Sequence, residues 1–167
     1  MAENYQLLDV KTLHQNEDNP RSIDDEMFRK LRCSILLFDK MLRLRPLVQR
    51  NLEVLGGNMR LKSLHWILSA TREEMANLLH GIEAWEQKKE DEKVALMEHW
   101  EKWQRNPMVP TLDANDFTDK EVEEFIAKDN ISYGRWCNRI LKKWNQKNLE
   151  DWGLAVKKAK DGKNVAE

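Results

Sequence analysis

One stretch, residues 47–64, constrains the fold most, because it combines strand, turn, strand, double glycine and helix in order. Two short apolar runs flank a polar turn at Asn51, which predicts a β-hairpin. Gly56-Gly57 follows at once and lets the backbone turn sharply, because glycine adopts a positive φ at little cost. A helix with apolar residues at helical spacing comes next. The apolar residues of this pattern are Leu47, Val48, Val54 and Leu55 in the strands and Leu61, Leu64 and Leu68 in the helix.

The double glycine also favours an anion site. The first amides of a helix have no carbonyl partner and carry a partial positive charge, and Arg60 lies in the same turn. This combination suits a phosphate group. A plain turn between strand and helix explains the same residues, so both interpretations stay open.

Composition limits the function classes. The chain has 167 residues, enough for one domain with a real core. Its net charge is only −1, so any nucleic-acid face must come from local clustering of cations. No apolar run is long enough to cross a membrane, and the N-terminus lacks the apolar core of a signal peptide. Cys33 and Cys137 fit no metal motif. We expect a cytoplasmic protein with no metal site and no membrane partner.

The chain before the hairpin predicts a strand, a loop and a helix. A first strand over residues 7–10 is followed by a polar loop over residues 14–19 with His14 on the surface. Pro20 stiffens the next turn and presents Arg21. Ser22 or Asp24 caps a helix, whose acidic first turn suits the helix dipole. The apolar stripe of this helix consists of Met27, Phe28, Leu31, Ile35 and Phe38.

Residues 40–46 show a two-residue alternation. Arg43 and Arg45 alternate with leucines, which predicts a strand with its arginines on one face. This face is either a solvated edge or an anion-binding wall near Arg60.

For the rest of the chain the sequence predicts helices on both sides of one further strand. Capping boxes at Thr71 and Thr118 begin two helical segments. Residues 71–106 form a helical insert, either a hairpin or a bent helix. Residues 108–112 form a strand that Pro110 marks as an edge. Further short helices follow a break at residues 129–134. We expect one domain over residues 1–156 and a charged, flexible tail over residues 157–167.

Several separated motifs together carry a resemblance to a known fold. They are Asn-Pro-Arg at 19–21, Arg-Pro-Leu-Val at 45–48, the glycine motif at 54–62, and two C-terminal motifs at 117–134 and 148–154. In this order they resemble the ParB/sulfiredoxin fold, and in particular the ParB-like nuclease-domain proteins of phages and mobile elements. The resemblance covers about nine-tenths of the chain, with residues 71–106 as an insert.

The resemblance implies an α+β domain: a small mixed sheet with packed helices, a helical insert and a helical C-terminal part. It implies a nucleoside triphosphate, CTP or ATP with Mg²⁺, or DNA phosphate, bound at the glycine motif. Its nucleotide- or phosphate-binding residues would be Arg21, Arg45, Gly56, Gly57, Asn58, Arg60 and Asn130. Asn130 is either a helix cap or a contact to base or ribose.

At the glycine motif this sequence differs from members of the family, and these differences limit the activities that we expect. Sulfiredoxins carry a catalytic Cys and then His where this chain has Asn58 and Met59, which argues against sulfinic-acid reduction. Partition proteins carry an acidic residue and two arginines there, of which only Arg60 remains.

The C-terminal motifs depart as well. The Glu-Asn-x-x-Arg motif of partition proteins is met only by Asp129-Asn130, with Tyr133 in place of the arginine. Residues 135–138 replace the acids usual in the phage group, so a metal site built from those acids is lost. No helix-turn-helix domain follows the core.

Three functions of different classes remain. The first is a binding module that holds nucleotide or DNA phosphate through Arg21, Arg45, Arg60 and the helix amides. The second is a Mg²⁺-dependent nuclease or nucleoside triphosphatase. The third is a non-catalytic adaptor whose insert docks a protein partner. Carboxylates for the second are Glu53, Asp113 and Asp129, and docking tryptophans for the third are Trp85, Trp100 and Trp103. The sequence leaves the catalytic residues unassigned and oligomer formation open.

Overall fold

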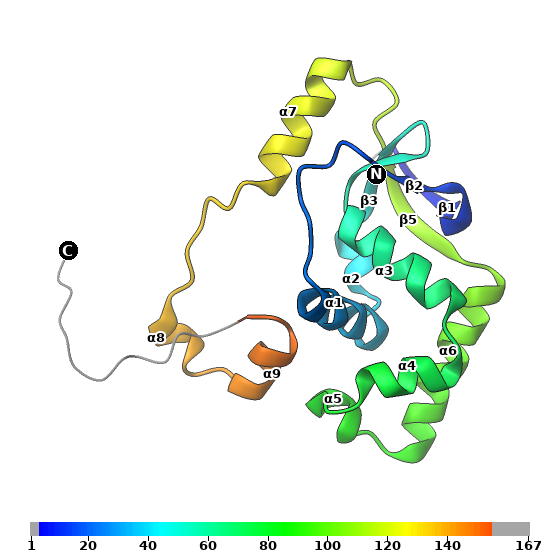
Figure 1. Cartoon of the computed structure of the whole chain (residues 1–167), viewed down its shortest axis with the longest axis vertical. Helices are drawn as coiled ribbons and strands as arrows, with labels where there is room; N and C mark the ends of the chain where they lie inside the picture. The colour runs from blue at the N-terminus through cyan, green and yellow to red at the C-terminus, as the bar shows by residue number, and fades with distance from the viewer. Residues whose placement is uncertain (1–3, 155–167) are drawn as a thin grey trace.

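The computed structural model describes residues 4–154 and shows a mixed α+β fold around a five-stranded sheet (Figure 1). The strand order is β1-β5-β3-β4-β2. Pairs β1–β5 and β3–β4 are antiparallel, whereas β5–β3 and β4–β2 are parallel, so the sheet is mixed. The strands are β1 (Tyr5–Asp9), β2 (His14–Gln15), β3 (Leu47–Arg50), β4 (Glu53–Gly56) and β5 (Met108–Asp113).

Helices of very different length surround the sheet. Four of them run over twelve residues or more, and the others are short connectors or caps within the described residues. In chain order they are a 3₁₀ turn η1 (Val10–Thr12), α1 (Asp25–Leu37), α2 (Met41–Leu44), α3 (Asn58–Ser69), α4 (Arg72–Leu79), α5 (Glu83–Glu86), α6 (Glu90–Arg105), α7 (Asp119–Asn130), α8 (Asn138–Leu141) and α9 (Gln146–Asp151).

The predicted hairpin and glycine turn are confirmed. Asn51 and Leu52 lie between β3 and β4 with φ of 52° and 69°, and a left-handed pair of this kind matches the twist of a hairpin. The Leu52 amide donates to Gln49 Oε1 at 2.8 Å, which holds the turn. Gly57 then takes φ of 94° and is the N-cap of α3. The second strand therefore passes into α3 through a single left-handed residue.

The core lies between the sheet and two layers of helix. Helix α3 contacts β2, β3 and β4, and α1 and α6 pack against α3. Trp100 on α6 is almost fully buried, and its Nε1 donates to the Leu36 carbonyl at 2.9 Å, so the largest core side chain is also hydrogen-bonded. Fully buried residues from the three layers include Val10, Leu47, Val54, Leu61, Leu64, Ile67, Met75, Leu79 and Val109.

Two local predictions before the glycine turn are wrong. Residues 41–44 form the helix α2 and not a strand, because a four-residue run is too short for the alternation of leucine and arginine to separate the two periods. Residues 14–15 form strand β2 within the expected loop, and they pair in parallel with β4. His14 is exposed, as expected.

Pro110 does not mark an edge strand. Strand β5 lies between β1 and β3 in the sheet. The bonds Val10 N to Pro107 O and Asp113 N to Asn4 O place Pro110 at a position that makes no hydrogen bond to β1. Its nitrogen faces the other neighbour, and β3 pairs with β5 only from Thr111 onward. A central strand tolerates the proline because its missing N–H falls where the ladder has not yet begun.

The insert consists of three helices. The capping box at Thr71 begins α4 as predicted, and the one at Thr118 begins α7. Gly81, with φ of 85°, lies between α4 and α5, and the charged residues that follow α5 lead into α6. Trp85 and Trp100 are buried in the core, which counts against their use as a docking surface.

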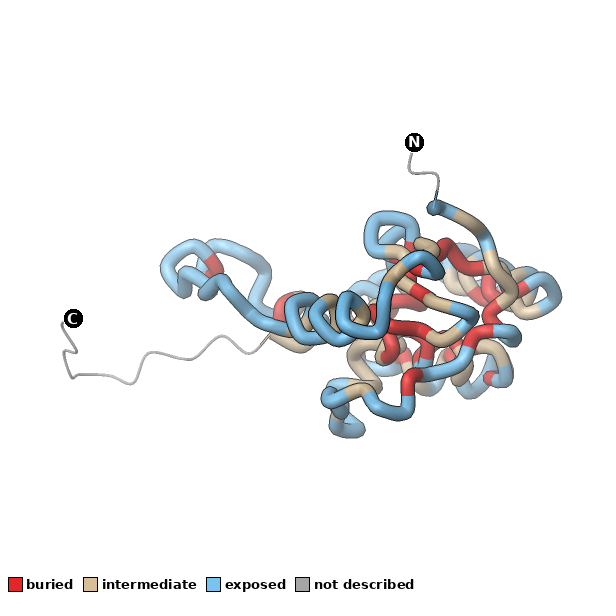
Figure 2. Tube along the Cα trace, turned by 90° about the horizontal axis from the view of Figure 1, so that it is seen from above, coloured by how far each residue is buried: buried red, intermediate tan, exposed pale blue. Residues whose placement is uncertain are grey.

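The C-terminal part leaves the body and returns to it. Helix α7 contacts β4, and α9 contacts α5 (Figure 1). Between these helices the chain stands out from the body, and residues 131–140 are all exposed (Figure 2). Gly153, with φ of 97°, follows the end of α9. The tail predicted over residues 157–167 lies outside the described residues.

Among residues 4–154 no helix has the length and apolar character that a membrane span needs.

Substitution of Gly57 tests the turn into α3. A Cβ at Gly57 would lie 2.6 Å from Leu47 Cδ2 and would also force a positive φ on an L residue. We expect Gly57→Ala to lower the free energy of unfolding by about 2 kcal/mol. Urea denaturation monitored by circular dichroism measures this change.

Two other glycines supply matched controls. Gly81 has a positive φ but no atom within 4 Å of its added Cβ, so Gly81→Ala should cost only about 1 kcal/mol. Gly134 has neither constraint, and Gly134→Ala should leave stability unchanged. Equal losses at Gly57 and Gly81 would show that the contact with Leu47 is unimportant.

Candidate functional site

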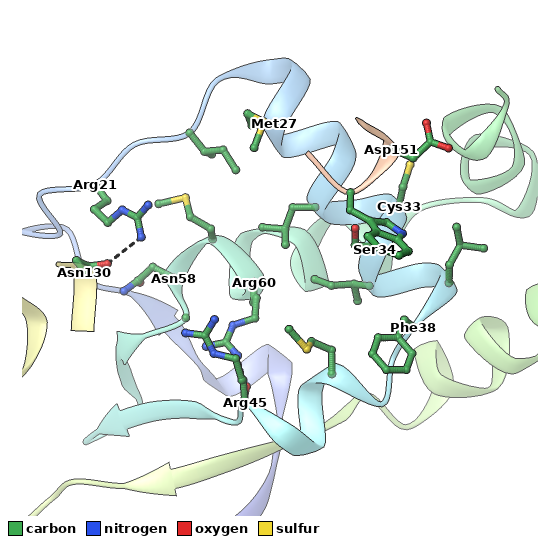
Figure 3. Close-up of a pocket in the computed structure, with 18 of the residues that line it drawn as sticks. Arg21, Met27, Cys33, Ser34, Phe38, Arg45, Asn58, Arg60, Asn130 and Asp151 are labelled. Carbon is green, nitrogen blue, oxygen red and sulfur yellow. Dashed lines mark hydrogen bonds between the residues drawn. The ribbon is translucent and has the colours of Figure 1, made fainter. Parts of the chain in front are cut away.

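A cleft of about 870 Å³ opens between α1, the start of α3, the end of α7 and α9 (Figure 3). It lies directly above the glycine turn, so the hairpin and α3 form its base. Its lining divides into a basic end and an apolar end. The cleft is large enough for a cofactor-sized ligand.

Three arginines from different elements line the basic end. Arg21 follows Pro20 before α1, Arg45 follows α2, and Arg60 lies in the first turn of α3. Within residues 4–154 none of the three forms an ion pair with a carboxylate. The structure therefore brings together the three cations that the sequence singled out, and leaves their charge uncompensated at short range.

Arg45 and Arg60 lie close together at this end (Figure 3). The Arg60 guanidinium donates to the Arg45 carbonyl. Burial and, to a smaller extent, the neighbouring Arg45 together lower the pKa of Arg60 to about 10, whereas Asp129 acts in the opposite direction. A half-buried guanidinium beside a second one raises the free energy of the folded state. A bound anion would reverse this effect.

The start of α3 faces the same arginine. A Cβ at Gly57 would lie 2.7 Å from Arg60 Nη2, so only a glycine lets the guanidinium lie against the backbone. The amides of the first turn of a helix have no carbonyl partner inside the helix. Backbone donors and a guanidinium therefore meet at one point of the cleft.

Asn58 lines the cleft, but its side chain is hydrogen-bonded to the backbone of neighbouring segments. Its side chain is buried: Nδ2 donates to the Val54 carbonyl at 2.8 Å, and Oδ1 accepts from the Asn16 amide at 3.0 Å. Both ends of the amide are thus engaged with the backbone. Asn58 fixes β4, the loop at Asn16 and α3 relative to one another, and so positions the turn.

Asn130 joins the two sides of the opening. Its Oδ1 accepts from Arg21 Nη1 at 3.1 Å, and its Nδ2 donates to the Ile126 carbonyl at 2.7 Å (Figure 3). Gly56 does not line the cleft. A Cβ there would lie 3.1 Å from Phe125 Cζ and 3.3 Å from Asp129 Oδ2, so its role is the close packing of α7 on β4.

The apolar end comes from residues that the sequence pattern assigned to the core. Met27 and Phe38 occupy stripe positions of α1 and its cap, yet both are exposed and face the cleft. Asp129, which the sequence singled out as a carboxylate, also lines it, and so does Trp152, which no local signal distinguished. The apolar lining consists of Ile23, Met27, Leu31, Ile35, Leu37, Phe38, Met41, Leu55, Met59, Ile82, Ala84 and Trp152.

The candidate metal carboxylates do not meet. Asp129 lines the cleft, whereas Glu53 on β4 lies beside His14, and Asp113 at the end of β5 accepts from Gln6 Nε2 at 3.1 Å. No cluster of three or more metal-ligating residues of the His, Cys, Asp or Glu type occurs within the described range.

Comparisons with models of protein families, with curated proteins and with solved structures gave no match to this chain.

Cys33 lines the cleft as a neutral thiol. Burial raises its pKa to about 11, and Sγ donates to the Leu78 carbonyl at 3.5 Å. We expect native protein at pH 8 to react with one equivalent of iodoacetamide, at the exposed Cys137, and unfolded protein with two. Intact mass measures the label, and Cys137→Ser should abolish the native reaction. Fast labelling of Cys33 would instead indicate a thiolate in the cleft.

The same pKa has a consequence for stability. A thiol whose pKa is raised in the folded state stabilises the fold only while the unfolded thiol keeps its proton. The contribution of Cys33 should therefore decline as the pH rises from about 9 to about 11.

Proposed function

We propose that this chain is a ParB-like module that binds a nucleoside triphosphate in the cleft, with the phosphates at the basic end. The observation that carries the proposal is the meeting of Arg21, Arg45 and Arg60 with the start of α3. Guanidinium groups and helix amides are the donors that phosphate groups prefer. The glycine motif, which resembles that of ParB-like proteins, supports the same class of ligand.

The apolar end favours a nucleotide over a bare phosphate. Inorganic phosphate would occupy only the basic end and leave the apolar wall of α1 exposed. A nucleotide combines a polyanion with a flat apolar base, and so matches both ends of one cleft. Asn130 and Asp129 also line the cleft, where the amide and carboxylate offer hydrogen-bonding groups to ribose or base.

In the absence of ligand, we expect the charge of Arg60 to lower the free energy of unfolding. Its lowered pKa means that the folded chain binds the proton less tightly than the unfolded chain. Arg60→Met keeps a long unbranched side chain and removes the charge. We therefore expect it to raise the free energy of unfolding by about 1 kcal/mol at pH 7.

The pH dependence gives an internal check. As the pH rises through about 10, folded Arg60 loses its charge first, and the difference between wild type and Arg60→Met should shrink. Urea denaturation at pH 7 and at pH 10.5 measures it, and Arg60→Lys, which keeps a charge, serves as the control. A lower free energy of unfolding for Arg60→Met than for wild type would contradict the view that the charge of Arg60 destabilises the fold.

Nucleotide binding is tested by thermal shift and isothermal calorimetry. ATP, CTP, GTP and UTP, each with Mg²⁺, are compared with inorganic phosphate and a short duplex DNA. We expect at least one nucleotide to raise the melting temperature by several degrees at about 100 times its Kd, because a ligand of the folded state alone stabilises it. Arg60→Met should abolish this shift while remaining folded.

The control is Arg43→Met, since Arg43 carries the same charge nearby but does not line the cleft. It should bind nucleotide as wild type does. A shift with phosphate equal to that with every nucleotide would reduce the proposal to an anion site, and no shift with any nucleotide would overturn it. Release of phosphate by a bound nucleotide would make the module a triphosphatase.

A further inference from the structure

The segment 131–144, here called the arm, exposes an unusual set of aromatic side chains. Tyr133 is 79% exposed, Trp136 66% and Trp144 51%. Between residues 131 and 147 only Leu141 is buried. Large aromatic residues normally lose most of their surface on folding, so three of them in one exposed segment indicate a surface that acts on a ligand.

The arm is also strongly basic. Arg135, Arg139, Lys142 and Lys143 are interspersed with the aromatic residues, and no Asp or Glu occurs from Asn130 to Leu149. None of the four cations forms an ion pair with a described carboxylate. Because the whole chain has a net charge of −1, the arm is a local positive segment on a protein whose remainder is acidic.

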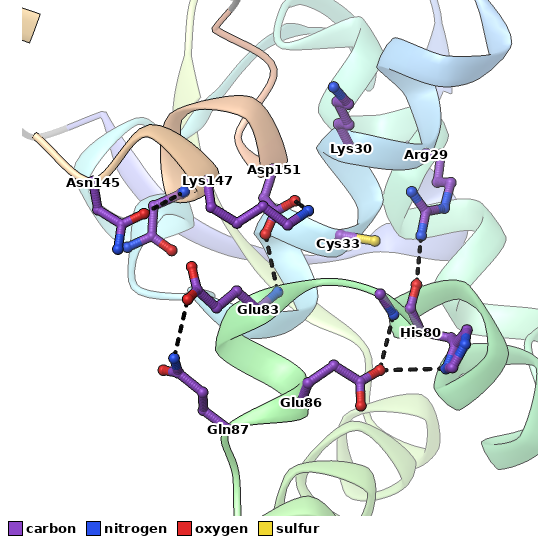
Figure 4. A network of polar contacts seen from close by, with 12 residues as sticks. Arg29, Lys30, Cys33, His80, Glu83, Glu86, Gln87, Asn145, Lys147 and Asp151 are labelled. Carbon is purple, nitrogen blue, oxygen red and sulfur yellow. Dashed lines mark hydrogen bonds and ion pairs between the residues drawn. The ribbon is translucent and has the colours of Figure 1, made fainter. Parts of the chain in front are cut away.

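Both ends of the arm are attached to the body. At one end, α7 packs against β4 through the contact of Phe125 with Gly56. At the other end, the buried carboxylate of Asp151 accepts from the Glu83 amide at 2.9 Å and from Lys147 Nζ at 2.7 Å, which fixes α9 to α5 (Figure 4). The residues between these anchors stand away from the body (Figure 2).

From these observations we propose that the arm binds single-stranded nucleic acid. Unpaired bases stack on exposed Tyr and Trp rings, and the neighbouring Arg and Lys side chains contact the phosphates between them. Aromatic and basic residues are interspersed along the arm, so both kinds of contact are available to one strand. The charge of the arm is complementary to this occupant along its whole length.

Other occupants fit the arm less well. A duplex hides its bases, so it would use the cations but leave the aromatic rings exposed. An interfacial membrane helix needs its apolar residues on one face of a long helix, whereas the arm contains only the four-residue α8. Protein interfaces are depleted in lysine at their centres, and here two lysines lie beside Trp144.

This inference uses no residue of the nucleotide cleft, so the two proposals can fail separately. Binding is measured by fluorescence anisotropy of a labelled oligothymidine of about 20 nucleotides with the full chain. We expect Trp136→Ala combined with Trp144→Ala to weaken binding at least tenfold, because each stacked base contributes substantially. Arg135→Ala combined with Arg139→Ala should reduce the slope of log affinity against log salt by about 1.

Two controls separate stacking from charge and the arm from the cleft. Lys102→Ala combined with Lys120→Ala removes two exposed cations elsewhere and should not change binding. Arg60→Met should also bind the strand as wild type does. An abasic strand of equal length should bind wild type at least tenfold more weakly than oligothymidine.

Each contrary outcome overturns the proposal. Equal binding of oligothymidine and the abasic strand would mean an electrostatic surface without stacking. Tighter binding of a duplex than of the single strand would assign the arm to duplex DNA. Binding of anionic phospholipid vesicles without strand binding would assign the arm to a membrane surface. No strand binding by wild type at low salt would exclude nucleic acid.

Discussion

The left-handed conformation of Gly57 is the constraint on which the rest of the structure depends. It turns the chain from β4 into α3 within one residue, and so sets where α3 lies on the sheet. The same residue touches Leu47 of the core on one side and the Arg60 guanidinium on the other. A Cβ at this position would clash on both sides. The packing of the core and the shape of the cleft therefore both require a glycine here.

The basic end of the cleft places two arginines where the stability of the fold disfavours their charge. Arg45 and Arg60 lie together where burial and like charge both favour a neutral arginine. A sequence selected for stability alone would place an uncharged residue at position 60, since burial already disfavours the charged guanidinium there. Retention of the charge at this cost is understandable if an anion binds there, because the anion converts the repulsion into attraction.

Local chemistry predicted the elements whose cause is local. The hairpin at Asn51, the turn at Gly57 and the caps at Thr71 and Thr118 follow from backbone preferences that act within four residues. Strand β2 and the central place of Pro110 were missed because they depend on which strands pair, and helix α2 because its run is too short to separate the two periods. The arginines of the cleft could be foreseen from the glycine motif. Its apolar wall could not, since a stripe residue is buried or exposed according to what the rest of the chain covers.

The net charge of the whole chain does not describe the charge of one exposed segment. A charge of −1 describes the whole chain, but at physiological salt a fixed charge acts only over about 8 Å. A ligand at the arm therefore meets the four cations around Trp136 and Trp144, and hardly any field from acidic helices such as α7. What decides recognition is the arrangement of charge along one exposed segment, together with the rings placed between the charges. The same composition distributed evenly over the surface would offer neither.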